Sequence, residues 1–207
     1  LEIYFYRSSE EKLWFLESEA RELGVVAVGD FVAMHEAWRG WPRVHIDFEK
    51  CSRLSDEHLE AVVLHEISHA VLHGSPLYYS IPIGTSVLNR FSAEEAVEVL
   101  YIASTIVKDI DVHELLMAVG MGRAVEFYAD FLANQYRDAG CSSAVEVLLL
   151  AKALVPCLYT KNCSTKTAVA SECRDTAEAV LDVLRDFRSR RVGDLARDVE
   201  LLVNMLL

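Results

Sequence analysis

Two histidines four residues apart, His65 and His69, constrain this chain most, because their spacing brings them together only on a helix. On an α-helix, this spacing places both side chains on one face, about 40° apart around the axis, so both imidazoles can reach one metal ion. Glu66 follows the first histidine directly, and its side chain can be aimed at a water molecule on the metal rather than at the metal itself. We therefore expect a zinc site for hydrolysis of an amide bond, in which zinc lowers the pKa of the water to about 7 and Glu66 accepts its proton. The alternative is a pair of core histidines that hydrogen-bond to backbone carbonyls.

The residues around this motif predict a helix that begins after Ser55 and ends at Gly74. Ser55 is a suitable N-cap, and Asp56 and Glu57 follow in the first turn, where the helix dipole favours carboxylates. Gly74 is a suitable C-cap, and Pro76 cannot continue the helix. Apolar residues flank the ligand face on both sides, so the helix is expected to be buried almost all round. A buried helix with these polar groups needs a reason to hold them.

A third ligand is required, because a catalytic zinc ion usually has three protein ligands. His73 lies two turns from His65, about 12 Å along the helix axis and too far for the same ion, so we expect it at a pocket wall or on the surface. Glu126 and Asp130, at i and i+4, share one face of a later, otherwise apolar helical segment. We predict that Glu126 is the third ligand and that Asp130 accepts the free ring N–H of a zinc-bound histidine. The alternative is a solvated acidic stripe.

These residues together resemble the motifs of the gluzincin metallopeptidases. The two segments are His65-Glu66-x-x-His69 and Glu126-x-x-Ala129-Asp130. The pattern is similar to that of the small soluble minigluzincins and of the prenyl-protein peptidase and HtpX-like group, with a second likeness to the ImmA/IrrE group. The resemblance covers about residues 55 to 137 and implies a zinc endopeptidase with Glu66 as the general base. The chain departs from the HtpX-like group in lacking membrane helices.

The resemblance does not assign a residue that stabilises the oxyanion of the reaction. The histidine and tyrosine candidates are His58, His113, Tyr128 and Tyr136. Three functions therefore stay open: an active zinc endopeptidase, an ImmA/IrrE-like regulatory protease that cleaves one protein partner, and a latent or non-catalytic zinc-binding protein. The second would be supported by a DNA-binding region, but no helix-turn-helix region with a basic recognition helix is evident. The third would require the fourth zinc position to be occupied by a cysteine or an acid from the C-terminal half. We favour the first.

Composition is typical of a globular enzyme that acts on a peptide or protein substrate. The 207 residues suffice for one domain or for one domain with an appendage, and 52% of them are hydrophobic. A net charge of −12 argues against nucleic acid and anionic membranes as partners. No apolar run is long enough to span a membrane, and no signal peptide is visible, so we expect a cytoplasmic protein. A homo-oligomer has no support in the sequence.

The five cysteines show neither a Cys-x-x-Cys pair nor zinc-finger spacing, so a structural metal site is not expected. We expect reduced cytosolic thiols. The alternative is a bridge between Cys157 and Cys163, as occurs inside cells of hyperthermophiles.

The periodicity of apolar residues predicts an α+β fold of zincin-like layout. We expect a small N-terminal sheet, a backing helix over Glu10–Leu23, the ligand helix, and then a mostly helical remainder. The predicted strands are Ile3–Tyr6, Val25–Val28, Phe31–Glu36 and Arg43–Phe48, with a hairpin turn at Arg39-Gly40. Residues 1–155 are assigned to the catalytic domain and residues 156–207 to a helical C-terminal extension. The alternative is that the extension belongs to the same domain.

Capping signals mark the starts of later helices. The three capping-box sequences are Ser92-x-x-Glu95, Asp111-x-x-Glu114 and Ser143-x-x-Glu146. Two amphipathic helices are expected at about Ser171–Arg190 and Asp194–Leu206. These last helices would complete the core, cover the cleft or make a dimer, and the sequence does not choose among the three.

Overall fold

A three-stranded mixed sheet forms the centre of the N-terminal part of the chain. In the computed structural model its order is β1–β3–β2. β1 (Glu2–Tyr6) pairs in parallel with β3 (Arg43–Asp47), and β2 (Ala33–Glu36) pairs with β3 in antiparallel fashion. The structure describes residues 1–25, 31–81, 84–137 and 139–207. Three of the four predicted strands are thus confirmed, and the prediction at Val25–Val28 falls largely outside the described residues.

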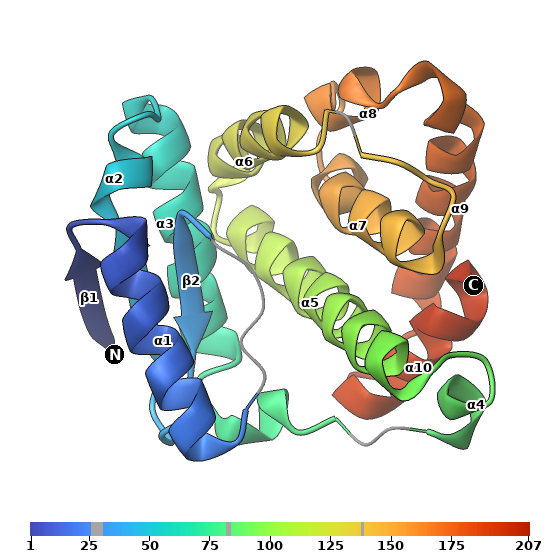
Figure 1. Ribbon diagram of the computed structural model, residues 1–207. Helices are drawn as coiled ribbons and strands as arrows, with labels where there is room; N and C mark the ends of the chain where they lie inside the picture. The colour runs from blue at the N-terminus through green and yellow to red at the C-terminus, as the bar shows by residue number, and fades with distance from the viewer. Residues whose placement is uncertain (26–30, 82–83, 138) are drawn as a thin grey trace. The chain divides into compact units, whose positions relative to one another are not determined.

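The chain divides into two compact units, Leu1–Ser80 and Ile81–Leu207. The first holds the sheet, and the second is helical throughout its described secondary structure, so the predicted α+β class is confirmed. Figure 1 follows the chain from the blue sheet to the red C-terminal helices. The predicted boundary after residue 155 falls within the second unit and stays a prediction.

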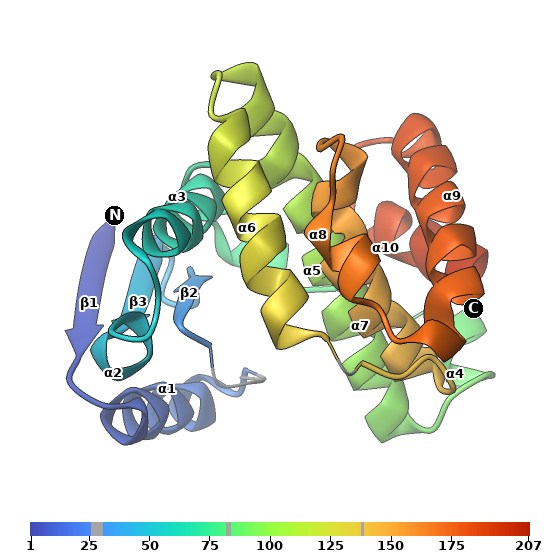
Figure 2. The same cartoon turned by 90° about the horizontal axis from the view of Figure 1, so that it is seen from above.

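Two helices cover opposite faces of the sheet in the first unit. α1 (Ser9–Leu23) lies on one face, and α3 (Asp56–Leu72) lies on the other, as Figure 2 shows. The short helix α2 (Phe48–Cys51) connects β3 to the segment before α3. Because side chains alternate along a strand, β3 directs Arg43, His45 and Asp47 towards α1 and its apolar residues towards α3. The ligand helix is therefore one layer of an α/β/α sandwich.

The face of the sheet that meets α1 is charged. Lys12 of α1 is 1% exposed and donates to Asp47 at 3.1 Å. Arg43 of β3 is 2% exposed and bonds both Glu19 of α1 and Glu36 of β2. Buried charges of this kind persist only when they are paired. These ion pairs connect α1 to β3, and β3 to β2.

In the second unit, helices pack around α5 (Ala93–Ala118). α7 (Ala144–Leu154) and α10 (Leu195–Leu206) both contact α5, and α9 (Arg174–Arg190) contacts α7 and α10. These four helices surround one large apolar core. The other elements of the two units are η1 (Pro76–Tyr79), α4 (Thr85–Leu88), α6 (Gly122–Gln135), η2 (Val155–Leu158), α8 (Ser164–Ala168) and η3 (Ser171–Cys173).

Two of the three predicted capping boxes are confirmed. Ser92 and Ser143 each accept the N–H of the glutamate three residues on, and each glutamate bonds back to the cap. The predicted helix start at Asp111 is wrong, because α5 runs through it without a break. Buried apolar residues on both sides of Asp111 keep the helix in the core, and its carboxylate instead pairs with Arg191 beyond α9.

Four cysteines form two disulfides, Cys141–Cys173 and Cys157–Cys163, and Cys51 is a buried free thiol. The expectation of reduced thiols is therefore wrong for those four residues. The Cα atoms of the bridged pairs are 5.8 and 5.2 Å apart, within the usual range for a disulfide. Among the described helices, none is long and apolar enough to cross a membrane.

Candidate metal centre

α3 begins and ends close to the predicted positions. Ser55 is the N-cap, and its Oγ accepts the backbone N–H of His58 at 3.3 Å. The C-cap is His73, one residue before the predicted glycine. Gly74 is needed for another reason: a Cβ atom there would lie 2.6 Å from the carbonyl oxygen of Ala70 and 3.1 Å from Pro42. The chain therefore leaves α3 in close contact with the loop that precedes β3.

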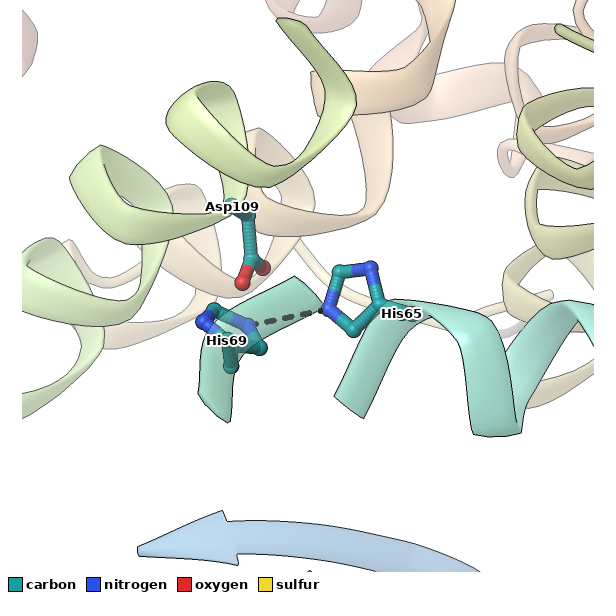
Figure 3. Close-up of side chains that lie close together, drawn as sticks. All are labelled: His65, His69 and Asp109. Atoms are coloured by element: carbon teal, nitrogen blue, oxygen red, sulfur yellow. Dashed lines mark hydrogen bonds between the residues drawn. The ribbon is translucent and has the colours of Figure 1, made fainter. Parts of the chain in front are cut away.

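His65 and His69 face each other on α3, as the spacing predicts. Their Nε2 atoms are 3.1 Å apart, and their rings are nearly perpendicular, at 81°. Figure 3 shows this contact as a dashed line. Two nitrogens bound to one tetrahedral zinc ion, at 2.0–2.1 Å each, would be about 3.3 Å apart. Both residues are buried, and the donor set fits a zinc or another imidazole-binding metal ion.

Glu66 is held by the neighbouring edge of the sheet. Its Oε2 accepts the backbone N–H of His35 in β2 at 2.8 Å. Among the described strands β2 is the last in the sheet order, so this bond holds the carboxylate between α3 and that strand. A glutamate next to the two imidazoles and fixed by a backbone donor has the chemistry of a general base.

His35 and Tyr79 belong to the same cluster, although neither was singled out in the sequence. The His35 ring lies parallel to that of His69, 8° apart in plane and 6.1 Å between centroids. Its Nδ1 lies 2.9 Å from the hydroxyl oxygen of Tyr79, in η1. The strand alternation of β2 contains the signal, since His35 lies two residues from buried Ala33 and so shares its face.

Of the two predicted locations for His73, a pocket wall and the surface, the surface is wrong. His73 is 2% exposed, and its Nδ1 lies 3.0 Å from Nδ1 of His69. The ring of Tyr78 meets it edge-on, at 4.9 Å between centroids. His69 thus has a partner at each ring nitrogen, with His65 at Nε2 and His73 at Nδ1.

The predicted acids lie on α6, in the second unit. Glu126 is in the second turn and exposed. Asp130 is half-buried, and its Oδ1 accepts a hydrogen bond from Ser164 of α8. Asp109 of α5, drawn in Figure 3, is an acid that the sequence analysis did not single out, and it is 3% exposed. The roles predicted for Glu126 and Asp130 remain predictions.

The predicted oxyanion candidates belong to different helices, His58 to α3, His113 to α5, and Tyr128 and Tyr136 to α6 and its C-cap. His58 is in the first turn of α3, where Ser55 Oγ lies 3.1 Å from its Nδ1. His113 is fully buried in α5 and packs against the rings of Tyr128 and Tyr159. Tyr136 is the C-cap of α6. None of these three observations assigns an oxyanion role.

Comparisons of the chain with protein-family models, with curated proteins and with solved structures find no match.

Proposed function

We propose that this protein is a zinc-dependent metalloendopeptidase that hydrolyses peptide bonds, with a zincin-like first unit. The observation that carries the proposal is the His65–His69 pair, whose Nε2 atoms are 3.1 Å apart, with Glu66 held beside it by β2. Two core histidines satisfied by carbonyls would have no need to face each other, since two bare nitrogen lone pairs repel unless a proton or a cation lies between them.

The roles follow from the donor chemistry. Zinc bound by the two Nε2 atoms would polarise the scissile carbonyl and lower the pKa of a water molecule to about 7. Glu66 would accept the proton of that water and pass it to the leaving amine, first as a general base and then as an acid. β2 ends the sheet order among the described strands, and such a strand can pair with an extended peptide substrate through its backbone groups other than the His35 N–H, which bonds Glu66.

The third ligand is proposed to be an acid of the second unit. Glu126 is the residue that the motif selects, and its exposure leaves its carboxylate accessible. Asp109 is the competing choice, because it is a carboxylate of α5 that is itself only 3% exposed. Two histidines and an acid are a ligand set of catalytic zinc sites. A buried carboxylate also needs a cation or hydrogen bonds to offset its desolvation.

Asp130 is retained as the proposed acceptor of a ring N–H from a zinc-bound histidine. Its bond with Ser164 does not exhaust it, because an ionised carboxylate has about four acceptor sites. The cytoplasmic location is likewise retained as a proposal. The two disulfides fit that location only in organisms whose cytoplasm preserves such bonds, as in hyperthermophiles.

Elemental analysis and peptide hydrolysis test the function together. The purified chain should contain one zinc ion, and it should cleave casein or quenched peptides until a chelator removes the metal. Glu66→Gln should retain the zinc and lose hydrolysis, because the amide cannot accept the proton. A protein that binds zinc through His65 and His69 but cleaves none of these substrates would be the latent zinc-binding alternative. A chain in which His69→Ala leaves the zinc affinity unchanged would refute the metal site itself.

A further inference from the structure

His69 touches a second histidine on the side away from His65. The two Nδ1 atoms of His69 and His73 are 3.0 Å apart, and both rings are buried. A contact at this distance is a hydrogen bond, so one of the two nitrogens carries a proton and the other accepts it. A metal ion on Nε2 of His69 would decide which, because only a nitrogen without a proton binds a metal ion.

We propose that His73 is a positioning residue that holds His69 in the tautomer needed to bind zinc, a role that rests on the metal site of the proposed function. If Nε2 of His69 binds the ion, its proton stays on Nδ1, and that N–H donates to Nδ1 of His73. His73 is then neutral, with its own proton on Nε2. Such a bond fixes the ring orientation and raises the basicity of the ligand.

The fold places the acceptor before any metal arrives. His73 is the C-cap of α3, and its backbone N–H donates to the carbonyl of His69 at 2.6 Å. The edge-on ring of Tyr78 lies on its other side. The close approach of Gly74 to Pro42 then fixes where the chain leaves the helix. His73 is thus tied to His69 through the backbone as well as through the ring.

A histidine acceptor differs from the carboxylate that commonly fills this role, because it adds no charge to a buried site. Desolvating a carboxylate costs free energy unless it is fully paired, whereas neutral imidazole costs much less. A neutral acceptor also leaves the net charge of the centre to the third ligand. This assignment makes His73 the partner of His69 and leaves Asp130, if it acts as proposed, for His65.

Three substitutions of His73 distinguish the effect of its hydrogen bond with His69 from the effect of its packing. Asn places its Oδ1 where Nδ1 of histidine stands, whereas Gln mimics Nε2 and Ala removes the acceptor. By competitive chelator titration, His73→Ala and His73→Gln should bind zinc about 10–100-fold more weakly than the wild type. His73→Asn should recover most of that loss. His58→Ala, on the first turn of α3, is the matched control and should leave the affinity unchanged.

The proton itself provides the second readout. In the zinc-loaded wild type, 15N-labelled histidine should show His69 protonated at Nδ1, with a proton protected from solvent exchange. His73→Asn should preserve this signal, and His73→Ala should lose the protection. The wild type and His73→Asn decide the case in which His73→Ala folds poorly, because both should carry the protected Nδ1 proton of His69.

Several outcomes would overturn the inference. Affinities of the Ala, Gln and Asn variants within about twofold of wild type would show that the bond does not support the metal, well short of the expected range. Equal losses in Ala and Asn would assign the effect to packing. A wild type that binds two zinc ions, one of them lost in His73→Ala, would make His73 a ligand. A wild type that binds no zinc refutes the proposed function and this role together, whereas one that binds zinc without cleaving peptides refutes only the peptidase.

Discussion

Replacing Arg43 by methionine should destabilise the first unit strongly, because the guanidinium is the centre of a buried charge network. Arg43 bonds Glu19 and Glu36 and is 2% exposed. The substitution removes a cation that both acids share while keeping the apolar stem of the side chain. Glu19 keeps Arg39 as a partner, and Glu36 keeps a contact with His45 Nε2 at 3.1 Å.

Removing one partner of a buried ion pair typically costs about 3–5 kcal/mol, because the remaining charge stays buried without compensation. The surviving partners of both acids place the expected loss near the lower end, about 3 kcal/mol at pH 7. Arg53→Met is the matched control, since Arg53 is 72% exposed and bonds Glu49 one turn away on the same surface. An exposed pair of this kind contributes about 0–1 kcal/mol.

Urea unfolding, followed by tryptophan fluorescence, measures the loss of unfolding free energy in the first unit. All three tryptophans, Trp14, Trp38 and Trp41, lie in the first unit, so the signal reports its unfolding alone. The free energies of unfolding of both variants are compared with that of the wild type at pH 7. If Arg43→Met lies within about 1 kcal/mol of Arg53→Met, the network does not stabilise the unit as a buried pair would.

The stability difference between Arg43→Met and the wild type should depend on pH, which a loss of packing alone would not produce. Burial tends to raise the pKa of Glu19, but hydrogen bonds and charge from Arg43 and Arg39 outweigh it and lower the pKa below its ordinary value of 4.5. A lowered pKa stabilises the folded state above the ordinary value, and this stabilisation is lost as the pH falls through the folded pKa. In Arg43→Met, the pKa of Glu19 should rise, because burial keeps its effect while the hydrogen bonds and charge of Arg43 are lost. Protonation of Glu19 then removes a buried negative charge. The difference between variant and wild type should therefore narrow as the pH falls from 7 through the acid range.

Three further predictions test the second unit and the thiols. Of Glu126→Ala and Asp109→Ala, the one that removes the third ligand should abolish stoichiometric zinc binding while the other leaves it, and equal, near-wild-type affinities in a chelator titration would exclude both acids. Asp130→Ala should weaken zinc binding about 10–100-fold, and an affinity within about twofold of wild type would favour an acid that serves only Ser164. One thiol per chain, that of Cys51, should titrate after unfolding without reductant, and a count of five would contradict both disulfides.

Local signals in the sequence predicted local structure well. Ser55, Ser92 and Ser143 each cap a helix as expected, because a capping side chain and its backbone partner are at most three residues apart. The same kind of signal failed at Asp111, where the apolar core around α5 outweighs a cap that could form only by breaking the helix. Capping therefore marks where a helix can start, and packing decides whether it does.

The parts of the site that the sequence did not reveal depend on contacts between distant segments. His35 joins the cluster because β2 lies beside α3. The alternation of β2 indicates the face on which His35 lies, but not that this face meets α3. His73 was set aside on its distance from His65, yet its contact is with His69, one turn away. Cys141 and Cys173 are 32 residues apart and meet only because of how the second unit folds. Tertiary placement, rather than residue type, was the missing information in each case.

The contacts among the rings of His65, His69 and His73 limit where residues can be inserted into or deleted from this part of the chain. His65, His69 and His73 are linked ring to ring at intervals of four residues, so each contact relies on the same helical phase. One inserted residue would turn everything beyond it by about 100° and shift it by about 1.5 Å, which would separate the rings on either side. Descendants that keep the cluster should therefore gain or lose residues outside the nine from His65 to His73, and substitutions alone should accumulate within them.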